Sequence, residues 1–323
     1  MAASRNSPRS SLAARIAAFL AARGAPDADL CVGLSGGCDS VVLLHVVANL
    51  DLGRRVRAVH VHHGLSANAD RWAAFCTGYC RDLGIDLLVE RVTVDRRSGH
   101  GLEAAAREAR YRAFAQAAGE WLLLGHHRGD QAETLLFNLL RGTGVAGAAA
   151  IPAERRGQQP RILRPLLAVP RADIEAYARH HRLDWVADES NRAPGLSRNF
   201  LRHQVLTALA ARFPAAERNL ARAAGRFAEA DALLGELALG DWQAAADGEA
   251  LKLAKLRGMS VPRLKNLLRF RLRELGWRAP AAARLEEFAR QLRSAGADRH
   301  PALDLAEGSM VAGRGLLRWV ARR

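Results

Sequence analysis

The sequence is poor in several features that would assign it to a particular class of protein. No uncharged apolar run approaches the roughly 18 residues that a membrane span needs, and Arg15 and Arg23 interrupt the apolar stretch Leu12–Ala22, which argues against a signal peptide. The cysteines include no Cys-x-x-Cys pair, which disfavours a zinc or iron–sulfur site, and four in 323 residues are too few for a disulfide scaffold. They are Cys31, Cys38, Cys76 and Cys80. We therefore expect a protein of the reducing cytoplasm that does not associate with membranes.

Acidic residues are also in short supply. Lys and Arg number 48 against 33 Asp and Glu, so the formal net charge is +15. Such an excess attracts polyanions, and nucleic acid is the partner that it favours. The abundance of Arg and Ala is typical of a GC-rich genome, but that drift explains Arg in place of Lys and not the excess of positive charge. Hydrophobic residues at 49% and charged residues at 25% exclude a mainly disordered chain.

Strand-like and helix-like segments alternate in the first half of the chain. Short apolar runs, bounded by turn residues, predict strands at Asp29–Leu34, Arg57–His62, Asp86–Val92 and Trp121–Gly125. Helical spacing predicts helices between and after them, at Val41–Leu50, Asn68–Leu83, Leu102–Ala118 and Asp130–Leu140. Four such alternations predict an α/β fold, a doubly wound parallel sheet that is covered by helices on both faces.

The rest of the chain has fewer strand signals. The predicted elements are a mobile loop at Gly142–Gln159, a last strand at Arg161–Leu166 and a helix at Pro170–Arg182. Beyond Pro214 only helical periodicity continues as far as Gly313, with one candidate short strand at Ala250–Leu253. The predicted domains are an N-terminal tail and helix (1–28), an α/β domain that carries the chemistry (29–214) and a C-terminal domain that is wholly or mostly helical (215–323).

The sharpest motif follows the first predicted strand. Residues 35–40, here called the phosphate loop, read Ser-Gly-Gly-Cys-Asp-Ser and lie between a strand and a helix. Adjacent glycines let successive backbone N–H groups converge on an anion, and the following helix adds its positive N-terminal end. Asp39 would repel a bare phosphate, so its presence indicates a divalent cation between the carboxylate and the phosphates. The residues predicted to bind the phosphates are Ser35, Gly36, Gly37, Cys38, Asp39 and Ser40.

A second polar segment follows the fourth predicted strand. Residues 125–134 read Gly-His-His-Arg-Gly-Asp-Gln-Ala-Glu-Thr and lie at a carboxyl strand end, where open α/β sheets bind ligands. Asp130 and Glu133 are three residues apart on one helix face, which suits magnesium binding and the placement of a nucleophile. His126 or His127 could hydrogen-bond a phosphate or take a proton. The alternative is structural, with Asp130 as the helix cap and Glu133 as its capping-box partner.

Both motifs resemble those of known enzymes. The phosphate loop is similar to the PP-loop of the N-type ATP pyrophosphatases, which cleave ATP between the α- and β-phosphates, and residues 125–134 resemble the HHxDDQAET signature of the bacterial tRNA(Ile)-lysidine synthetase family. The resemblance covers about residues 29–212, and more loosely the chain to about residue 305. Stretches that also agree are Val61–Leu65 with Asp70, Trp72, Cys76 and Cys80; Glu103, Arg107, Arg110 and Tyr111; Arg141–Gly144; Arg164–Leu167; Asp188–Asn191; and Ser197–Arg202. Where the family usually has two adjacent Asp after the histidines, this chain has Gly129 and Asp130.

The resemblance implies a two-step reaction with ATP and Mg²⁺. ATP adenylates C2 of the wobble cytidine in a tRNA(Ile) with a CAU anticodon and releases pyrophosphate, and the ε-amine of free L-lysine then attacks C2 and displaces AMP. The implied catalytic residues are Asp39, His126, Asp130, Glu133, Arg107 and Arg110. The ATP-binding set adds His62 and Gly125 to the phosphate loop, and the metal ligands are Asp39 and Asp130.

The sequence leaves three points open. We expect the cluster of His126, Asp130 and Glu133 to take the proton that the lysine amine must lose. Arg107 and Arg110 hold the phosphates or the base, or else they belong to a solvated helix face. A homodimer is left open.

Basic residues concentrate in the segment Lys252–Arg273, which holds eight Lys or Arg and no acidic residue. All three lysines of the chain fall here, and interleaved leucines predict a helix that packs on one side and shows charge on the other. That suits a duplex RNA stem, which is met mainly through its phosphates and 2′-hydroxyls. By resemblance, Asp188–Asn191 and Ser197–Arg202 lie near the tRNA. The predicted tRNA-binding residues are Arg198, Asn199, Arg202, Lys252, Lys255, Lys265 and Arg269, and the alternative is an ordinary loop and a solvated charged face.

Three other functions are alternatives to a lysidine-forming ligase. A tRNA thiolase of the same superfamily would carry sulfur-handling cysteine pairs, which this sequence lacks. Activity like that of an NAD or GMP synthetase is disfavoured by the basic C-terminal region. A tRNA-binding protein with a decayed site has only Gly129 in its support. Release of pyrophosphate from ATP on addition of tRNA would separate an enzyme from such a binding protein.

Overall fold

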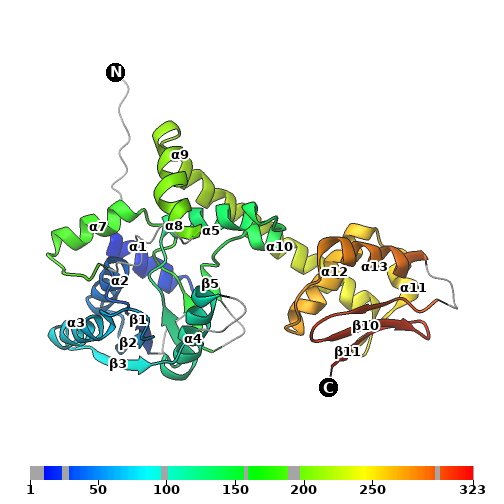
Figure 1. Cartoon of the computed structure of the whole chain (residues 1–323), viewed down its shortest axis with the longest axis horizontal. Coiled ribbons are helices and arrows are strands. Elements are labelled where there is room, and N and C mark those ends of the chain that lie inside the picture. The colour runs from blue at the N-terminus through cyan, green and yellow to red at the C-terminus, as the bar shows by residue number, and fades with distance from the viewer. Residues whose placement is uncertain are drawn as a thin grey trace. The chain divides into compact units, whose positions relative to one another are not determined.

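The computed structural model describes residues 11–23, 29–95, 101–155, 159–187, 197–294 and 299–322. The chain divides between Phe227 and Ala228 into two compact units (Figure 1). None of the described helices is both long enough and apolar enough to cross a membrane.

The first unit is built on a six-stranded sheet with the order β3-β2-β1-β4-β6-β5. Its strands are β1 (Leu30–Gly33), β2 (Val56–His62), β3 (Asp86–Arg91), β4 (Trp121–Leu123), β5 (Glu154–Arg155) and β6 (Arg161–Leu163). All neighbours pair in parallel except β5, which pairs antiparallel with β6 at the edge. The strand order reverses between β1 and β4, and such a switch point is where α/β sheets form a ligand crevice.

Helices cover both faces of this sheet, as the alternation of strands and helices predicts. One face packs against α1 (Leu12–Ala21), α2 (Cys38–Ala48), α3 (Ala69–Asp82) and α7 (Arg171–His180). The other face packs against α4 (Leu102–Ala117). Strand β1 serves both sides, because Leu30 and Val32 join the first core and Cys31 joins the second. The doubly wound α/β class is therefore confirmed.

The segment Gly142–Gln159, predicted as a mobile loop, contains α6 (Val145–Ala148) and β5. Side chains of α5 (Arg128–Leu140) hydrogen-bond to two of its described residues, and residues 156–158 of the segment lie outside the described part of the chain. Gln131 accepts a hydrogen bond from the Ile151 N–H (2.9 Å) and donates one to its carbonyl (3.1 Å), and Asn138 Nδ2 donates to the Gly147 carbonyl (2.7 Å). For the described residues the loop prediction was wrong, because these contacts come from a helix outside the segment and leave no local pattern.

Four further helical elements end the first unit and lead into the second. They are α8 (Ser197–Phe200), the π-helix η2 (Leu201–Val205), α9 (Leu206–Arg212) and α10 (Ala216–Ala245). The predicted boundary at 214/215 precedes α10, whereas the two units meet within it. The first turns of α10 pack with the α/β unit, since Leu220, Ala224 and Phe227 join the cluster around Leu135.

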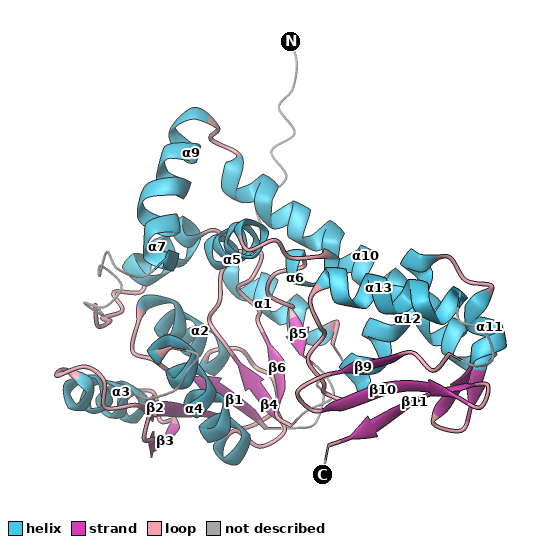
Figure 2. Ribbon diagram, turned by 45° about the vertical axis from the view of Figure 1, so that its right-hand side comes forward, coloured by secondary structure: helices cyan, strands magenta, loops and turns pink. Residues whose placement is uncertain are grey.

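The second unit combines helices with a five-stranded antiparallel sheet of order β7-β8-β11-β10-β9. Its helices after α10 are α11 (Leu253–Arg257), α12 (Val261–Glu274) and α13 (Ala282–Ser294), and its strands are β7 (Ala246–Asp247), β8 (Ala250–Lys252), β9 (Ala302–Asp304), β10 (Gly308–Gly313) and β11 (Leu316–Ala321). Helices α12 and α13 lie along this sheet (Figure 2), and their leucines form one core with Met310 and Leu317 of the strands.

Helices outweigh strands in this unit. Strand β8 covers the first three residues of the candidate strand at Ala250–Leu253, whose last residue begins α11. The expectation that helical periodicity alone continues to Gly313 was wrong, because β9 and β10 lie there. Strand β10 does alternate, with Gly308, Met310 and Ala312 buried and the residues between them partly exposed. Two of its three buried residues are Gly and Ala, so the alternation is weak in hydrophobicity and invisible in the sequence.

The core of the second unit can be tested at two neighbouring positions. Leu268 of α12 is fully buried, whereas Arg269 is exposed. We expect Leu268→Ala to lower the free energy of unfolding by about 2–5 kcal/mol, because it leaves a cavity, and Arg269→Ala to change it by less than about 0.5 kcal/mol. Urea unfolding followed by circular dichroism measures both. Equal effects of the two substitutions would contradict the placement of α12.

Candidate active site

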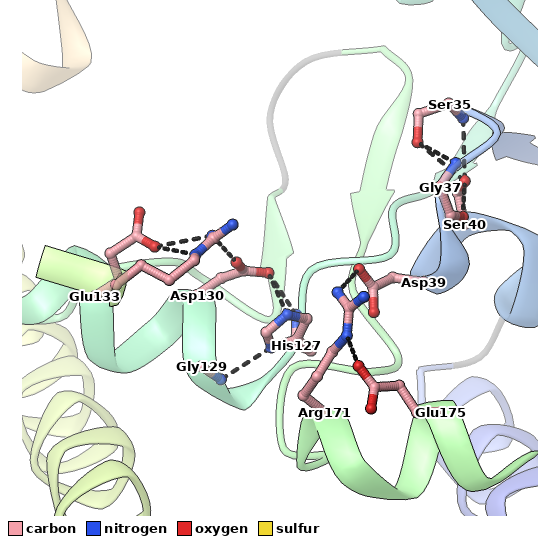
Figure 3. Close-up of polar contacts among 11 residues, drawn as sticks. Ser35, Gly37, Asp39, Ser40, His127, Gly129, Asp130, Glu133, Arg171 and Glu175 are labelled. Atoms are coloured by element: carbon pink, nitrogen blue, oxygen red, sulfur yellow. Dashed lines mark hydrogen bonds and ion pairs between the residues drawn. The ribbon is translucent and has the colours of Figure 1, made fainter. Parts of the chain in front are cut away.

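The phosphate loop lies between β1 and α2, at the switch point of the sheet. The Ser35 N–H donates to Ser40 Oγ (3.1 Å), Ser40 Oγ donates to the Gly37 carbonyl (2.9 Å), and the Gly37 N–H donates to Ser35 Oγ (3.3 Å) (Figure 3). Helix α2 begins at Cys38, three residues before the predicted start. The serine hydroxyls thus brace the loop at the positive end of a helix, the arrangement that binds anions.

Two residues of the loop, Gly36 and Cys38, pack closely against the protein interior. Gly36 has a φ of +84°, and a Cβ there would lie 2.7 Å from Val186 Cγ2. The Val186 N–H donates to the Gly36 carbonyl (2.9 Å), so the segment after α7 supports the loop. The Cys38 side chain is buried in the core, and burial raises the pKa of its thiol to about 11. Only the backbone of Cys38 is therefore placed to contact a phosphate.

Gly125, two residues after β4, packs against the start of α2. A Cβ at this position would lie 3.1 Å from the carbonyl carbon and oxygen of Asp39 and 3.2 Å from Ser40 N. These are backbone atoms at the start of a helix, which cannot move aside as a flexible side chain would. Glycine at 125 therefore lets the second polar segment lie directly against the phosphate loop.

The Asp39 carboxylate is held by an arginine that the sequence did not single out. Arg171 Nη1 donates to Asp39 Oδ2 (2.6 Å), and Arg171 Nε donates to Glu175 Oε1 (3.0 Å). Burial raises the pKa of Asp39, and the charges of His127 and Arg171 oppose that rise. Asp39 Oδ1 is buried and has no hydrogen-bond partner within the described part of the chain. Arg171 was missed because, among so many arginines, its neighbours in sequence do not distinguish it.

His127 caps helix α5. The ring nitrogen Nδ1 of His127 accepts a hydrogen bond from the Gly129 N–H (3.0 Å). The backbone N–H of His127 donates one to Asp130 Oδ2 (2.9 Å). His127 is 7% exposed. A capping box is therefore present, but His127 is the cap and Asp130 its partner, in place of the pair Asp130 and Glu133.

Asp130 and Glu133 lie together and bind one arginine. Arg202 of η2 donates from Nη2 to Asp130 Oδ1 (2.8 Å) and from Nε to Glu133 Oε2 (2.8 Å). Glu133 is 3% exposed, and burial raises its pKa while Arg202 opposes that rise. The predicted tRNA-binding residue Arg202 is therefore a partner of the site carboxylates in this structure, and the pair of carboxylates already accommodates a cation.

His126 is surrounded by positive charge. Arg164 Nε donates to His126 Nδ1 (3.3 Å). Burial and then the charge of Arg164 lower the pKa of His126 to about 4, with Arg107 and Arg110 adding to the effect. The ring is therefore neutral near pH 7. Arg107 and Arg110 are exposed on α4, yet their charges act on His126, so they belong to the surroundings of the site.

His62 lies on the strand next to β1. It ends β2, is buried, and contacts Asp70 Oδ1 (3.2 Å) and an Arg91 nitrogen (3.4 Å). Its described contacts are therefore with neighbours on α3 and β3.

The remaining residues predicted to bind tRNA have varied surroundings. Arg198 lies over the ring of Phe137, and Asn199 is buried. Lys252, Lys255 and Arg269 are exposed on the second unit, whereas Lys265 pairs with Glu286 (3.0 Å). Other basic residues of this stretch are also paired, in the ion pairs Arg263–Asp241, Arg271–Glu249 and Arg273–Asp231. Asp188–Asn191 and the Ser197 side chain lie outside the described residues.

The site has few candidate metal ligands. Among the described residues, no group of three or more His, Cys, Asp or Glu is arranged to hold a metal ion. The predicted ligands Asp39 and Asp130 each face an arginine. Mg²⁺ is commonly held by one or two carboxylates together with substrate phosphates and water, so the unpartnered Asp39 Oδ1 beside the phosphate loop fits such an ion.

Two family models match the chain. Residues 8–209 match the model of a PP-loop domain, which is more than half of the chain, and residues 251–322 match the model of the TilS substrate binding domain.

Curated proteins are similar over most of the chain. The tRNA(Ile)-lysidine synthase of Aromatoleum aromaticum is 50% identical over 278 residues, which are 85% of this chain and 65% of that protein. The enzyme of the same name from Alkalilimnicola ehrlichii is 47% identical over 91% of this chain and 67% of its own. That of Pseudomonas aeruginosa is 46% identical over 90% and 68%. The chain thus spans about two thirds of the length of these relatives.

A solved structure shares the fold. The U34-tRNA thiolase NcsA from Methanococcus maripaludis, determined with its [4Fe-4S] cluster, superposes with a TM-score of 0.55 at 15% identity over 68% of this chain and 78% of that one. At this identity the likeness concerns the fold alone.

The packing at Gly125 predicts the effect of one methyl group. We expect Gly125→Ala to weaken ATP binding and to lower the free energy of unfolding by about 1–3 kcal/mol, because the new Cβ meets the backbone at the start of α2. Gly78, inside α3 with open space around it, provides the control, and Gly78→Ala is expected to raise stability by about 0.5–1 kcal/mol. Calorimetry with ATP and urea unfolding measure the two quantities. Unchanged ATP affinity in Gly125→Ala would contradict the contact.

His126 predicts a pH dependence of stability. Above its ordinary pKa of about 6.5 the ring is neutral in the folded and the unfolded chain. As the pH falls from there toward 4, the unfolded chain binds a proton that the folded chain does not, because the folded pKa is about 4. We expect the wild type to lose about 1–3 kcal/mol more than His126→Gln over this range, measured by unfolding in urea at each pH. Parallel pH curves would contradict the low pKa.

Proposed function

The chain belongs to the tRNA(Ile)-lysidine synthase family, and from that premise we propose that it joins free L-lysine to C2 of the wobble cytidine of a CAU-anticodon tRNA(Ile), with ATP and Mg²⁺. The observation that carries the proposal is the meeting of the phosphate loop with Asp130 and Glu133 at the switch point of the sheet. The phosphate loop suits the phosphates of ATP, and the two carboxylates suit the ammonium group of lysine, which becomes the nucleophile once it loses a proton. The reaction needs both within reach of one cytosine.

In the first step the cytidine O2 attacks the α-phosphorus of ATP and pyrophosphate leaves. Catalysis of such a step is mainly a matter of positioning and of neutralising charge on the leaving group. The backbone of the phosphate loop and the start of α2 supply the donors, and Gly125 keeps them close to the second segment. Asp39 and Asp130 would hold Mg²⁺, which when bound neutralises phosphate charge.

In the second step the lysine ε-nitrogen bonds to C2, the C2–O bond breaks, and AMP leaves with that oxygen. Asp130 and Glu133 already hold the guanidinium of Arg202, which supports their role as the acceptor of the lysine ammonium. The amine must lose its proton to attack. Glu133 suits that task better than an ordinary carboxylate because burial raises its pKa, whereas His126, with a pKa of about 4, is a poor base.

The second unit is the proposed contact with tRNA. Residues 251–322 carry the match to the TilS substrate binding domain, and Lys252, Lys255 and Arg269 are exposed there. These three side chains would meet RNA phosphates, whereas Lys265 would first have to leave Glu286. A cytoplasmic location and a homodimer remain predictions.

Gly129 does not argue strongly for a decayed site. A Cβ at residue 129 would lie 2.8 Å from His127 Cε1, so the imidazole of this chain occupies the space that a side chain would need. The carboxylate of Glu217, paired with Arg128 (2.6 Å), lies 3.7 Å from the same point. A carboxylate paired with an arginine therefore lies beside residue 129, although residue 129 itself is glycine.

A sulfur-transfer function is disfavoured by the state of the cysteines. All four are buried and free, and burial raises the pKa of every one, that of Cys76 to about 12. A thiol with such a pKa is a poor nucleophile at neutral pH.

The proposal is tested by one incubation with ATP, Mg²⁺, isotope-labelled lysine and a tRNA(Ile) transcript with a CAU anticodon. We expect mass spectrometry of the anticodon nucleosides to find lysine on the wobble cytidine, and Asp39→Asn to lower its yield at least about 100-fold. Pyrophosphate release without lysine transfer would indicate another nucleophile, and neither product would indicate a binding protein.

Glu133→Gln separates the two steps. We expect it to keep tRNA-dependent pyrophosphate release within about threefold and to lower lysine transfer at least about tenfold, because the ammonium loses a partner while the phosphate loop is unchanged. Glu120→Gln, an exposed carboxylate in a turn, is the matched control. A parallel loss of both products in Glu133→Gln would contradict the assignment.

A further inference from the structure

Arg164 is the only buried arginine among the described residues, with 2% of its surface exposed. It directly follows β6, at the carboxyl end of that strand. No described carboxylate forms an ion pair with it. A buried guanidinium without a counter-ion is costly, so its hydrogen bonds must satisfy it from groups that lack charge.

Three acceptors share the guanidinium of Arg164. Nη1 donates to the Pro152 carbonyl (2.7 Å), Nη2 to Tyr111 Oη (3.3 Å) and Nε to His126 Nδ1 (3.3 Å). The guanidinium has donors only and cannot accept. His126 Nδ1 must therefore present its lone pair, and the one proton of the neutral imidazole lies on Nε2.

The groups that face His126 favour the neutral ring. Arg164 comes from the end of β6 and Arg107 and Arg110 from α4, and all three oppose a positive charge on the imidazole. Asp130 of α5 acts in the other direction. Protonation at Nδ1 would also replace the Arg164 hydrogen bond by a clash between two donors.

We propose that Arg164 is a positioning residue of the site, which holds His126 as the neutral tautomer with its proton on Nε2. His126 then acts only as a hydrogen-bond donor toward an anionic group, such as a phosphate oxygen of the ATP in the proposed function on which this inference rests. It does not accept the proton of the nucleophile. The single arginine thereby decides which of two opposite roles the histidine has.

The tautomer is measured directly by nitrogen NMR of the full chain labelled with ¹⁵N-histidine, with the His126 signals assigned by their loss in His126→Gln. We expect Nδ1 to show the shift of an unprotonated acceptor nitrogen and Nε2 that of a protonated one, unchanged from pH 8 to pH 6. A proton on Nδ1, or a charged ring at pH 6, would overturn the proposal. The measurement needs neither substrate nor turnover, so it stands apart from the test of the proposed function.

Arg164→Gln tests the cause. We expect the titration midpoint of His126 to rise by at least about one pH unit, because the nearest charge is removed, and the signals of both tautomers to appear. Arg155→Gln is the matched control, since Arg155 contacts Tyr111 too, by lying over its ring, and no described bond joins it to His126. An unchanged midpoint in Arg164→Gln would contradict the proposal. If that variant fails to fold, the wild-type tautomer still decides.

A double-mutant cycle separates positioning from a direct role. We expect Arg164→Gln to lower kcat/KM for pyrophosphate release at least about tenfold in the wild type and less than about twofold in the His126→Gln background. Additive losses would show that Arg164 acts independently of His126 and would overturn the proposal.

Discussion

The contact between Gly125 and the first residues of α2 is the constraint on which the site depends. Gly125, two residues after β4, has no side chain, so the helix that begins behind the phosphate loop lies against the segment that carries His126, Asp130 and Glu133. Parallel strands end at one edge of a sheet, and the reversal of strand order beside β1 opens a crevice there. Loop, helix end and carboxylates are thereby brought to one place by the backbone, before any side chain contributes.

Arginines then determine how the acidic and basic groups of this place behave. Arg171 holds Asp39, Arg202 holds Asp130 and Glu133 together, and Arg164 holds His126. Each pairing joins elements that are distant in the sequence. Buried carboxylates would repel one another without these cations, and burial does raise the pKa of Asp39 and of Glu133. On the proposed function, the ammonium group of lysine would take the place of Arg202 at Asp130 and Glu133.

The same logic explains the basic stretch of the second unit. Its composition suggests one continuous cationic face, but Arg263, Lys265 and Arg271 are each neutralised by an acidic residue from another element. Lys252, Lys255 and Arg269 are left exposed. Net charge predicts that a polyanion binds, whereas the surface that meets it depends on which charges the fold has already paired.

The sequence by itself determined the doubly wound α/β class, the phosphate loop and the resemblance to one family, because these depend on local patterns: apolar runs, adjacent glycines, and carboxylates three residues apart on a helix. Only the tertiary structure decided the rest. Arg171 is indistinguishable from other arginines along the chain, and Arg164 lies in a stretch that resembles the family but shows no role there. The roles of both arise from partners more than thirty residues away. Strand β10 escaped notice because two of its three buried residues are Gly and Ala, and β9 because it has only three residues. His127 and not Asp130 caps α5 because Gly129 leaves room for the imidazole, a condition set by close packing and not by sequence spacing.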